Sequence, residues 1–301
     1  MQLRQLQYFV AVAELESFTA ASNRLNVVQS ALSRQIANLE DELGVVLFHR
    51  NGRRVELAPA GERLQKAVSK ILVDIEDLRT IVRALDDDIS GTVALGAHFS
   101  EGDVIIPKIL DRVFREYPAI HLDPIQGLTA DLQDRLLKGQ LDLAIVTFPD
   151  PLPGLDLEPI AREKLYVAGP ASDFPIAKLE CTIAEALSIP QVVAHKPNRE
   201  RIALEDIAKK NNISLKVAVE ADGLSLMKLF SQQGRGAIIL PETALRMEMS
   251  NSNWKVIPIE DLSLTRWLAR RSSNLQNKPV EKVYNILLEE IANLKKVGMM
   301  F

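Results

Sequence analysis

The sequence has very little cysteine and no long apolar segment. Its single cysteine, Cys181, has no second cysteine to pair with, so a switch that joins two cysteines of this chain is excluded. No apolar run approaches the roughly 20 residues that a membrane-spanning helix needs, and the first residues, MQLRQLQYF, contain no hydrophobic signal region. With a net charge of −4 and a mean hydropathy near zero, the 301 residues are expected to form a globular cytoplasmic protein that does not contact a membrane.

The usual patterns of catalytic and cofactor-binding residues are also missing. We predict no metal site and no nucleophile from His98, His121 or His195, and Cys181 is expected to be a small buried apolar residue. The Gly-Arg-Gly stretch at 234–236 precedes a predicted strand, whereas a dinucleotide-binding loop follows one. We therefore expect no cofactor and no enzymatic activity.

Residues 18–44 have the pattern of two short helices separated by a turn. Ser17 can cap the first helix, Asn26 suits a left-handed residue at its end, and Gly44 suits the end of the second helix. Apolar residues of the second helix recur at spacings of 4, 3 and 4 and predict one buried stripe: Leu32, Ile36, Leu39 and Leu43.

The other face of this second helix carries small and polar residues at its N-terminal end, namely Gln29, Ser30, Ser33 and Arg34. Small residues permit close approach to a DNA groove, and Gln and Arg can form two hydrogen bonds to one base edge. This arrangement is typical of a helix-turn-helix, whose second helix enters the major groove. Two apolar helices packed at an angle would also show the stripe, but that alternative does not account for the polar cluster.

A predicted hairpin follows, with Asn51-Gly52 as its two-residue turn. Its tip carries His49 and three arginines, Arg50, Arg53 and Arg54. Beside a recognition helix, such a hairpin is a wing that contacts phosphates or a narrow minor groove. The alternative is a solvated basic turn.

Residues 59–88 predict a long helix with a seven-residue repeat. Its apolar positions step by 4 and 3 in alternation: Leu64, Val68, Ile71, Ile75, Leu78, Val82 and Leu85. A seam of this kind is typical of a coiled coil, so we expect a homodimer through this helix. Packing of the seam against the chain's own domain remains an alternative, because neighbouring apolar residues broaden it.

In this order, the helix-turn-helix, wing and long helix resemble the LysR-type transcriptional regulators. The resemblance is carried by LRQLQYFVAVAELESFTAASNRLNVVQSALSRQIANLEDELGVVLFHR and RRVELAPAGE, and it continues weakly to the C-terminus. Val28 and Ala58 depart from the family pattern, which has a small residue and a Thr at these positions. The resemblance implies binding to double-stranded DNA, and it adds a homotetramer to the expected homodimer.

Residues 92–301 alternate between short apolar runs and amphipathic helical patterns, which predicts parallel sheets covered by helices. The resemblance implies a periplasmic-binding-protein-like pair of α/β lobes, lobe I at 92–164 and 267–301 and lobe II at 165–266. The expected organisation is α/β: a winged helix-turn-helix at 1–58, a linker helix at 59–88 and a two-lobed regulatory domain at 89–301.

Candidate effector residues lie where strands end and helices begin, which is where α/β sheets bind ligands. They are Ser100, Thr129, Thr147 and Phe148 in lobe I, and His195, Asn198 and Arg199 in lobe II. The resemblance implies effector contacts at Ser100, Thr129 and 197–199, which adds Pro197 to the candidates. Helix N-termini and an opposing Arg would suit a small anionic metabolite between the lobes. For Ser100 and Thr129 a plain helix cap is the alternative, and for Arg199 a solvated helix start.

Three other functions are alternatives to a ligand-responsive regulator. A LysR-type regulator without an effector would share every feature above. A periplasmic solute-binding protein needs an export signal and has no use for residues 1–88, and an enzyme needs a nucleophile, metal site or phosphate loop.

Overall fold

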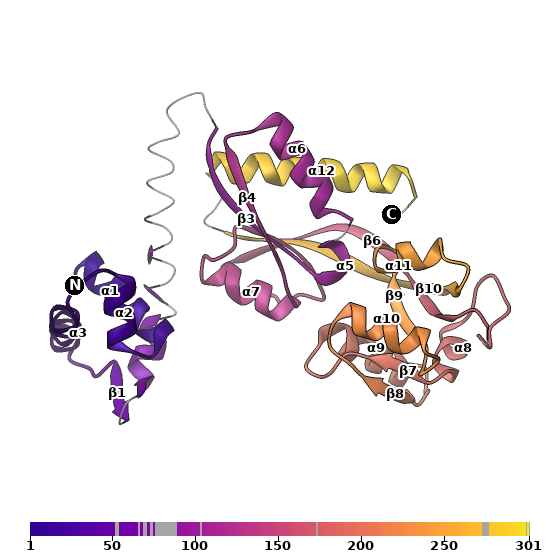
Figure 1. Cartoon of the computed structure of the whole chain (residues 1–301), viewed down its shortest axis with the longest axis horizontal. Coiled ribbons are helices and arrows are strands. Elements are labelled where there is room, and N and C mark those ends of the chain that lie inside the picture. Colours follow the sequence, from indigo (N-terminus) through magenta and orange to yellow (C-terminus); the bar gives the residue numbers. More distant parts are fainter. Residues whose placement is uncertain are drawn as a thin grey trace. The chain divides into compact units, whose positions relative to one another are not determined.

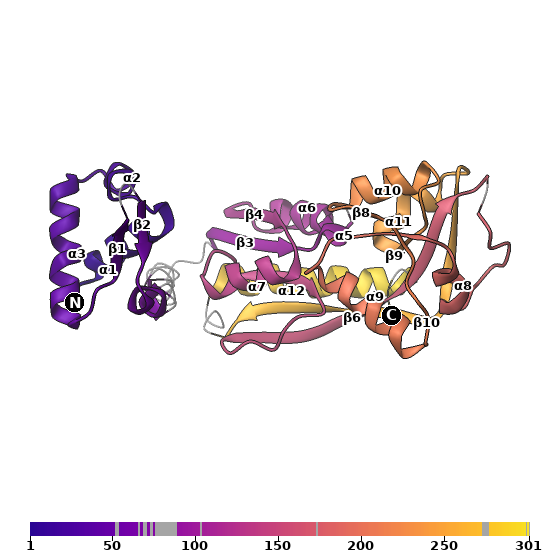
Figure 2. The same ribbon diagram turned by 90° about the horizontal axis from the view of Figure 1, so that it is seen from below.

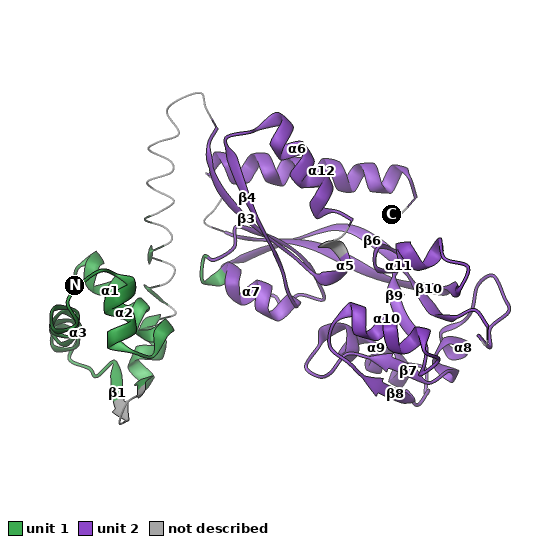
Figure 3. Ribbon diagram, in the orientation of Figure 1, with its two compact units in different colours: residues 1–85, 137–139 green, residues 86–136, 140–301 purple. Residues whose placement is uncertain are grey.

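The structure is a computed structural model that describes residues 1–51, 54–65, 67–68, 71–72, 75, 89–102, 104–172, 174–272, 277–298 and 300. The chain forms two compact units (Figure 3): residues 1–85 with 137–139, and the remaining residues. Each unit is described separately below.

The first unit begins with three helices around a small core (Figure 1), namely α1 Leu3–Leu15, α2 Phe18–Arg24 and α3 Gln29–Leu43. The Ser17 side chain accepts a hydrogen bond from the amide of Ala20, and Asn26 and Gly44 have positive φ angles of 52° and 67°, so all three predicted helix boundaries are confirmed. The predicted stripe is confirmed at Leu32, Ile36 and Leu39, which are buried. Leu43 is 38% exposed, so its predicted burial is wrong. Leu43 is the last residue of α3 and does not belong to the core of this unit.

A hairpin completes this unit, with β1 Phe48–Asn51 antiparallel to β2 Arg54–Leu57. Asn51 belongs to the strand and pairs with Arg54, so the predicted turn at 51–52 is one residue too early. Residues 52 and 53 lie outside the described residues. The register places Phe48 and Val55 in the core with the three helices, and burial of these two side chains takes precedence over the local turn preference.

The second unit contains a six-stranded sheet with the order β4-β3-β5-β10-β6-β9. Lobe I contributes β3 Gly91–Ala97, β4 Ile120–Gln126 and β5 Leu143–Thr147, which are mutually parallel as predicted. Its helices are α5 Phe99–Gly102, α6 Ile106–Glu116, α7 Thr129–Leu137 and the C-terminal α12 Lys278–Lys296. The apolar faces of α6 and α12 cover Val93 and Leu95 of β3 in one core.

Lobe II is built around a small parallel pair of strands, β7 Gln191–Val193 and β8 Val217–Glu220. Its other elements are α8 Ile183–Ser188, α9 Arg199–Lys210, α10 Leu224–Gln232, β9 Ile238–Pro241 and α11 Glu242–Met249. This lobe has cores of its own, which include Val167, Ile238 and Leu245.

Two long strands, β6 Leu155–Pro170 and β10 Trp254–Arg271, run side by side through both lobes (Figure 2). Ile160 and Leu268 belong to the core of lobe I, whereas Val167 and Ile257 belong to that of lobe II. Both strands pair antiparallel with their neighbours, so the purely parallel sheets predicted from the sequence are wrong at this place. The two-lobed α/β class itself is confirmed.

The described residues contain neither a membrane span nor a metal cluster. No helix among them combines the length and the apolar character that crossing a bilayer requires. No group of three or more His, Cys, Asp or Glu side chains in the described part of the chain is placed to hold a metal ion.

Candidate functional site

The N-terminal end of α3 presents the polar residues that the sequence singles out for base reading. Gln29, Ser30 and Arg34 are exposed, and Ser33 is half-buried. Thr19 of α2 donates a hydrogen bond of 3.2 Å to the side-chain oxygen of Gln29, which orients that amide. Thr19 was not among the residues predicted from the sequence to belong to this surface. This arrangement allows α3 to present its small and polar side chains to a groove.

The structure describes less of the wing and linker. Arg53 lies outside the described residues, and the side chains of Arg50 and Arg54 are not described. Leu78, Val82 and Leu85 of the predicted dimer seam are also outside them.

Of the described seam positions, Val68 is buried in the core of the first unit, and Leu64 packs against that core. Ile71 is 41% exposed and Ile75 is half-buried. The start of the linker helix therefore uses part of its predicted seam within its own unit.

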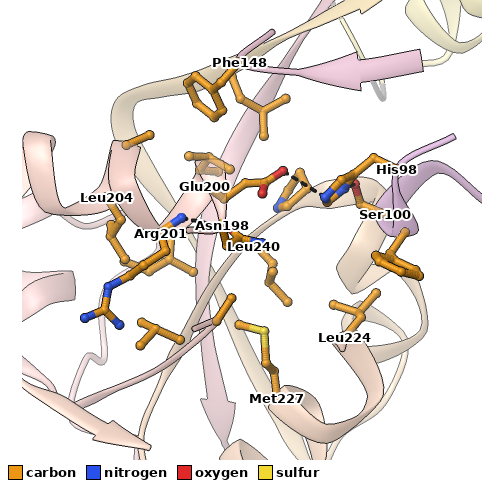
Figure 4. A pocket seen from close by; sticks show the side chains of 18 of the residues that line it. His98, Ser100, Phe148, Asn198, Glu200, Arg201, Leu204, Leu224, Met227 and Leu240 are labelled. Carbon is orange, nitrogen blue, oxygen red and sulfur yellow. Dashed lines mark hydrogen bonds and ion pairs between the residues drawn. The ribbon is translucent and has the colours of Figure 1, made fainter. Parts of the chain in front are cut away.

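A cavity of about 470 Å³ lies between the lobes (Figure 4). It is mainly apolar, and the residues along its walls include Phe99, Leu165, Leu204, Met227 and Leu240. Its volume and lining are those of a small-molecule site.

Three of the predicted effector residues line this cavity: Ser100, Phe148 and Asn198. Asn198 caps α9, accepting from the amide of Arg201 at 3.0 Å. Phe148 follows β5 with a φ of 46°, a left-handed conformation that is unusual for a bulky residue. Strained residues of this kind concentrate at ligand sites.

The other predicted effector residues do not line the cavity. Thr129 and Thr147 are buried, and the hydroxyl of Thr129 donates to the carbonyl of Thr147 at 2.8 Å. Arg199 forms an ion pair with Asp150 of lobe I. The exposed His195 has Nδ1 3.3 Å from Asp222, and Pro197 is exposed beside it.

At one end of the cavity, polar groups of both lobes meet around Glu200 of α9. The hydroxyl of Thr147 donates to Oε1 of Glu200 at 2.5 Å, and Nε2 of His98 lies 3.2 Å from the same oxygen. Nδ1 of His98 lies 3.2 Å from Oγ of Ser100. Burial lowers the pKa of His98 below its ordinary value, against the raising influence of Glu200.

A buried ion pair lies beside the cavity on the two long strands. Both side chains of the pair are fully buried, and Arg266 donates to Oε2 of Glu163 from Nε at 2.9 Å and from Nη2 at 2.7 Å. The amide of Thr243 donates to the other carboxylate oxygen at 2.6 Å. Burial raises the pKa of Glu163, but two charge-assisted hydrogen bonds of this geometry are typical of an ionised pair.

Sequence reasoning missed three of the polar residues that line the cavity: His98, Glu200 and Arg266. His98 directly follows β3, two positions before the predicted Ser100, and Glu200 lies in the first turn of α9, next to the predicted Arg199. Arg266 is in β10, which was not predicted as a strand, and no local signal marks it.

Two family descriptions match this chain. "Bacterial regulatory helix-turn-helix protein, lysR family" matches residues 3–62, and "LysR substrate binding domain" matches residues 86–292. The chain therefore belongs to the LysR family, and it is a transcriptional regulator with a DNA-binding helix-turn-helix and an effector-binding domain.

Individual relatives agree with this assignment. The HTH-type transcriptional regulator BbuR of Bordetella bronchiseptica is 28% identical over 97% of this chain and 91% of its own. A probable hydrogen peroxide-inducible genes activator of Streptomyces viridosporus is 30% identical over 83% and 80%. The structure of a full-length OxyR variant from Pseudomonas aeruginosa is similar with a TM-score of 0.77, 25% identity, and coverage of 97% and 94%.

Proposed function

We propose that this regulator binds double-stranded DNA as a homodimer or homotetramer and that a small anionic metabolite in the inter-lobe cavity modulates it. The cavity of about 470 Å³ carries this proposal, because a mainly apolar cavity of this size with a few polar groups is the usual form of a small-molecule site. A ligand held by both lobes favours the lobe arrangement that it binds more tightly, and it can thereby change the contacts between subunits. On this proposal the protein acts in the cytoplasm, beside its DNA, and is not an enzyme.

The DNA-binding part of the proposal rests on α3. We assign base contacts to Gln29, Ser30, Ser33 and Arg34, and backbone or minor-groove contacts to Arg50, Arg53 and Arg54. The exposure of the polar end of α3 supports the first set.

A thermal-shift screen of carboxylic acids on the full chain, followed by mobility-shift assays on genomic fragments with each hit, tests the proposal. We expect at least one acid to raise the unfolding midpoint and to change the retardation pattern. Ala203 lines the cavity, so Ala203→Phe should remove both effects while DNA binding persists. Retained effects in this variant would place the ligand elsewhere, and a screen without hits would favour regulation without an effector.

A further inference from the structure

The polar end of the cavity has the donors of a carboxylate-binding site. Thr147 donates to one oxygen of Glu200 at 2.5 Å, and Nε2 of His98 is 3.2 Å from that oxygen. Figure 4 shows the side chains of His98 and Glu200 directed toward each other and in contact, with Ser100 beside the histidine. A carboxylate accepts hydrogen bonds and donates none, so lobe I presents groups suited to an acid at this point.

The carboxylate beside these lobe I groups belongs to Glu200 of lobe II. Glu200 is the second residue of α9, and the preceding residue, Arg199, forms an ion pair with Asp150 of lobe I. Gln133 fixes the backbone of Asp150 with two hydrogen bonds of 2.7 and 3.1 Å. The first turn of α9 therefore connects the lobes through two adjacent side chains of opposite charge.

The arginines that line the cavity are already paired with carboxylates of the protein. Nε of Arg201 donates to Glu205 at 2.8 Å, and Arg266 is bonded to Glu163. Part of the charge of these arginines is therefore already balanced, and an acidic ligand at the Glu200 end of the cavity would compete with Glu200 for the donors there.

We propose that Glu200 is an internal carboxylate that occupies the anion subsite of the free protein, and that the effector's carboxylate displaces it. The ligand class is then a carboxylic acid with an apolar body, in agreement with the apolar walls. Displacement breaks the contact of Glu200 with Thr147, so the first turn of α9 keeps only the ion pair of Arg199 with Asp150 as its other contact with lobe I. This inference rests on the proposed function, since it takes the cavity as the effector site.

Replacement of the internal acid tests the proposal without knowledge of the effector. In the full-length Glu200→Ala variant, acetate should fill the vacated subsite, with an affinity about tenfold higher than for the wild-type chain. Titration at constant ionic strength, followed by the thermal unfolding midpoint, measures this difference. Acetamide has the same shape and no charge, and it should not bind more tightly to the variant.

Asp206→Ala is the matched control, because it removes one exposed acid from the same helix outside the cavity lining. Its acetate affinity should equal that of the wild type. Equal acetate affinity of Glu200→Ala and Asp206→Ala, or equal binding of acetate and acetamide, would overturn the proposal.

Glu200→Gln keeps the size of the side chain and provides a second measurement should the alanine variant not fold. Its acetate affinity should lie between those of the wild type and Glu200→Ala, and an affinity equal to the wild type would also overturn the proposal. Mobility-shift assays on the same variants distinguish a failure of the Glu200 subsite from a failure of the proposed function. If only the subsite proposal is wrong, the protein still binds DNA and still responds to a ligand found in the screen. If the proposed function is wrong, the DNA binding or the response to a ligand is absent.

Discussion

The polar residues of α3 and those of the inter-lobe cavity are held in different ways. On α3, Gln29, Ser30 and Arg34 are exposed, and their side chains are accessible before DNA arrives. In the cavity, Glu200 contacts Thr147 and Arg266 contacts Glu163, so the polar groups are already bonded to other parts of the protein. A partner of α3 meets exposed side chains, of which Gln29 accepts one hydrogen bond from Thr19 of the neighbouring helix. A ligand of the cavity has to exchange contacts that already exist there, and this exchange couples its binding to the arrangement of the lobes.

The largest expected effect comes from breaking the most buried of these cavity contacts. Arg266→Met leaves the Glu163 carboxylate buried without its cation and should lower the unfolding free energy of the second unit by about 3–5 kcal/mol. Both tryptophans, Trp254 and Trp267, lie in this unit, so denaturant unfolding followed by tryptophan fluorescence reports on it.

Arg115→Ala is the control for this measurement, since Arg115 forms an exposed ion pair with Asp111 and should change stability by less than about 0.5 kcal/mol. Equal effects of the two substitutions would show that the buried pair stabilises the unit no more than a surface pair.

A substitution in the linker helix tests whether seam positions of the first unit contact a second copy of the chain in a homodimer. Ile75→Asp should raise the dissociation constant of the homodimer by at least about a hundredfold, because it buries a charge in the proposed seam. Sedimentation velocity at micromolar concentrations should show a folded monomer. Arg63→Ala, an exposed position of the same helix, should leave the dimer intact. A wild-type chain that sediments as a monomer would contradict the proposed seam.

The exposed face of α3 predicts a smaller effect, confined to DNA binding. Arg34→Ala should cost about 1–3 kcal/mol of binding to the preferred site and relax sequence preference. Arg53→Ala should weaken binding to all sequences alike and flatten the salt dependence. Fluorescence anisotropy with preferred and scrambled duplexes over a salt series distinguishes them. Specific binding that survives Arg34→Ala in a folded protein would remove α3 from its assigned role.

The smallest effect is expected at Cys181, which is buried and takes no part in either site. Burial raises the pKa of its thiol to about 11, so at neutral pH almost none of it is the reactive thiolate. Iodoacetamide should modify the folded protein at least about a hundred times more slowly than a free thiol. Hydrogen peroxide should leave DNA binding unchanged in mobility-shift assays. Rapid modification by iodoacetamide, or loss of DNA binding in hydrogen peroxide, would contradict the expectation that Cys181 is unreactive.

Features that depend on neighbouring residues could be predicted from the sequence. Ser17, Asn26 and Gly44 determine helix boundaries through their own backbone and side chains, and the structure confirms all three. The α3 stripe was also predicted, apart from Leu43, which is the exposed last residue of the helix.

Features that depend on pairing between distant parts of the chain were harder to predict from the sequence. The long strands β6 and β10 carry charged residues such as Lys164 and Asp261, so they do not read as continuous apolar runs. In the cavity, Ser100 and Asn198 were found because strand ends and helix starts have local signals. The contact of Thr147 with Glu200 joins residues 53 positions apart, and that of Glu163 with Arg266 joins residues 103 apart. Such pairs are determined by sheet topology, which local patterns do not encode.

The position of α12 at the C-terminal end of lobe I has a consequence for synthesis on the ribosome. Val283, Leu287 and Ile291 of this helix complete the core that covers Val93 and Leu95 of β3. Lobe I therefore cannot close its core until residues made about 190 positions later have emerged, whereas lobe II is one continuous stretch of chain. During that interval α6 alone covers the apolar face of the first sheet strands, and the part that awaits α12 leaves the growing chain exposed to aggregation.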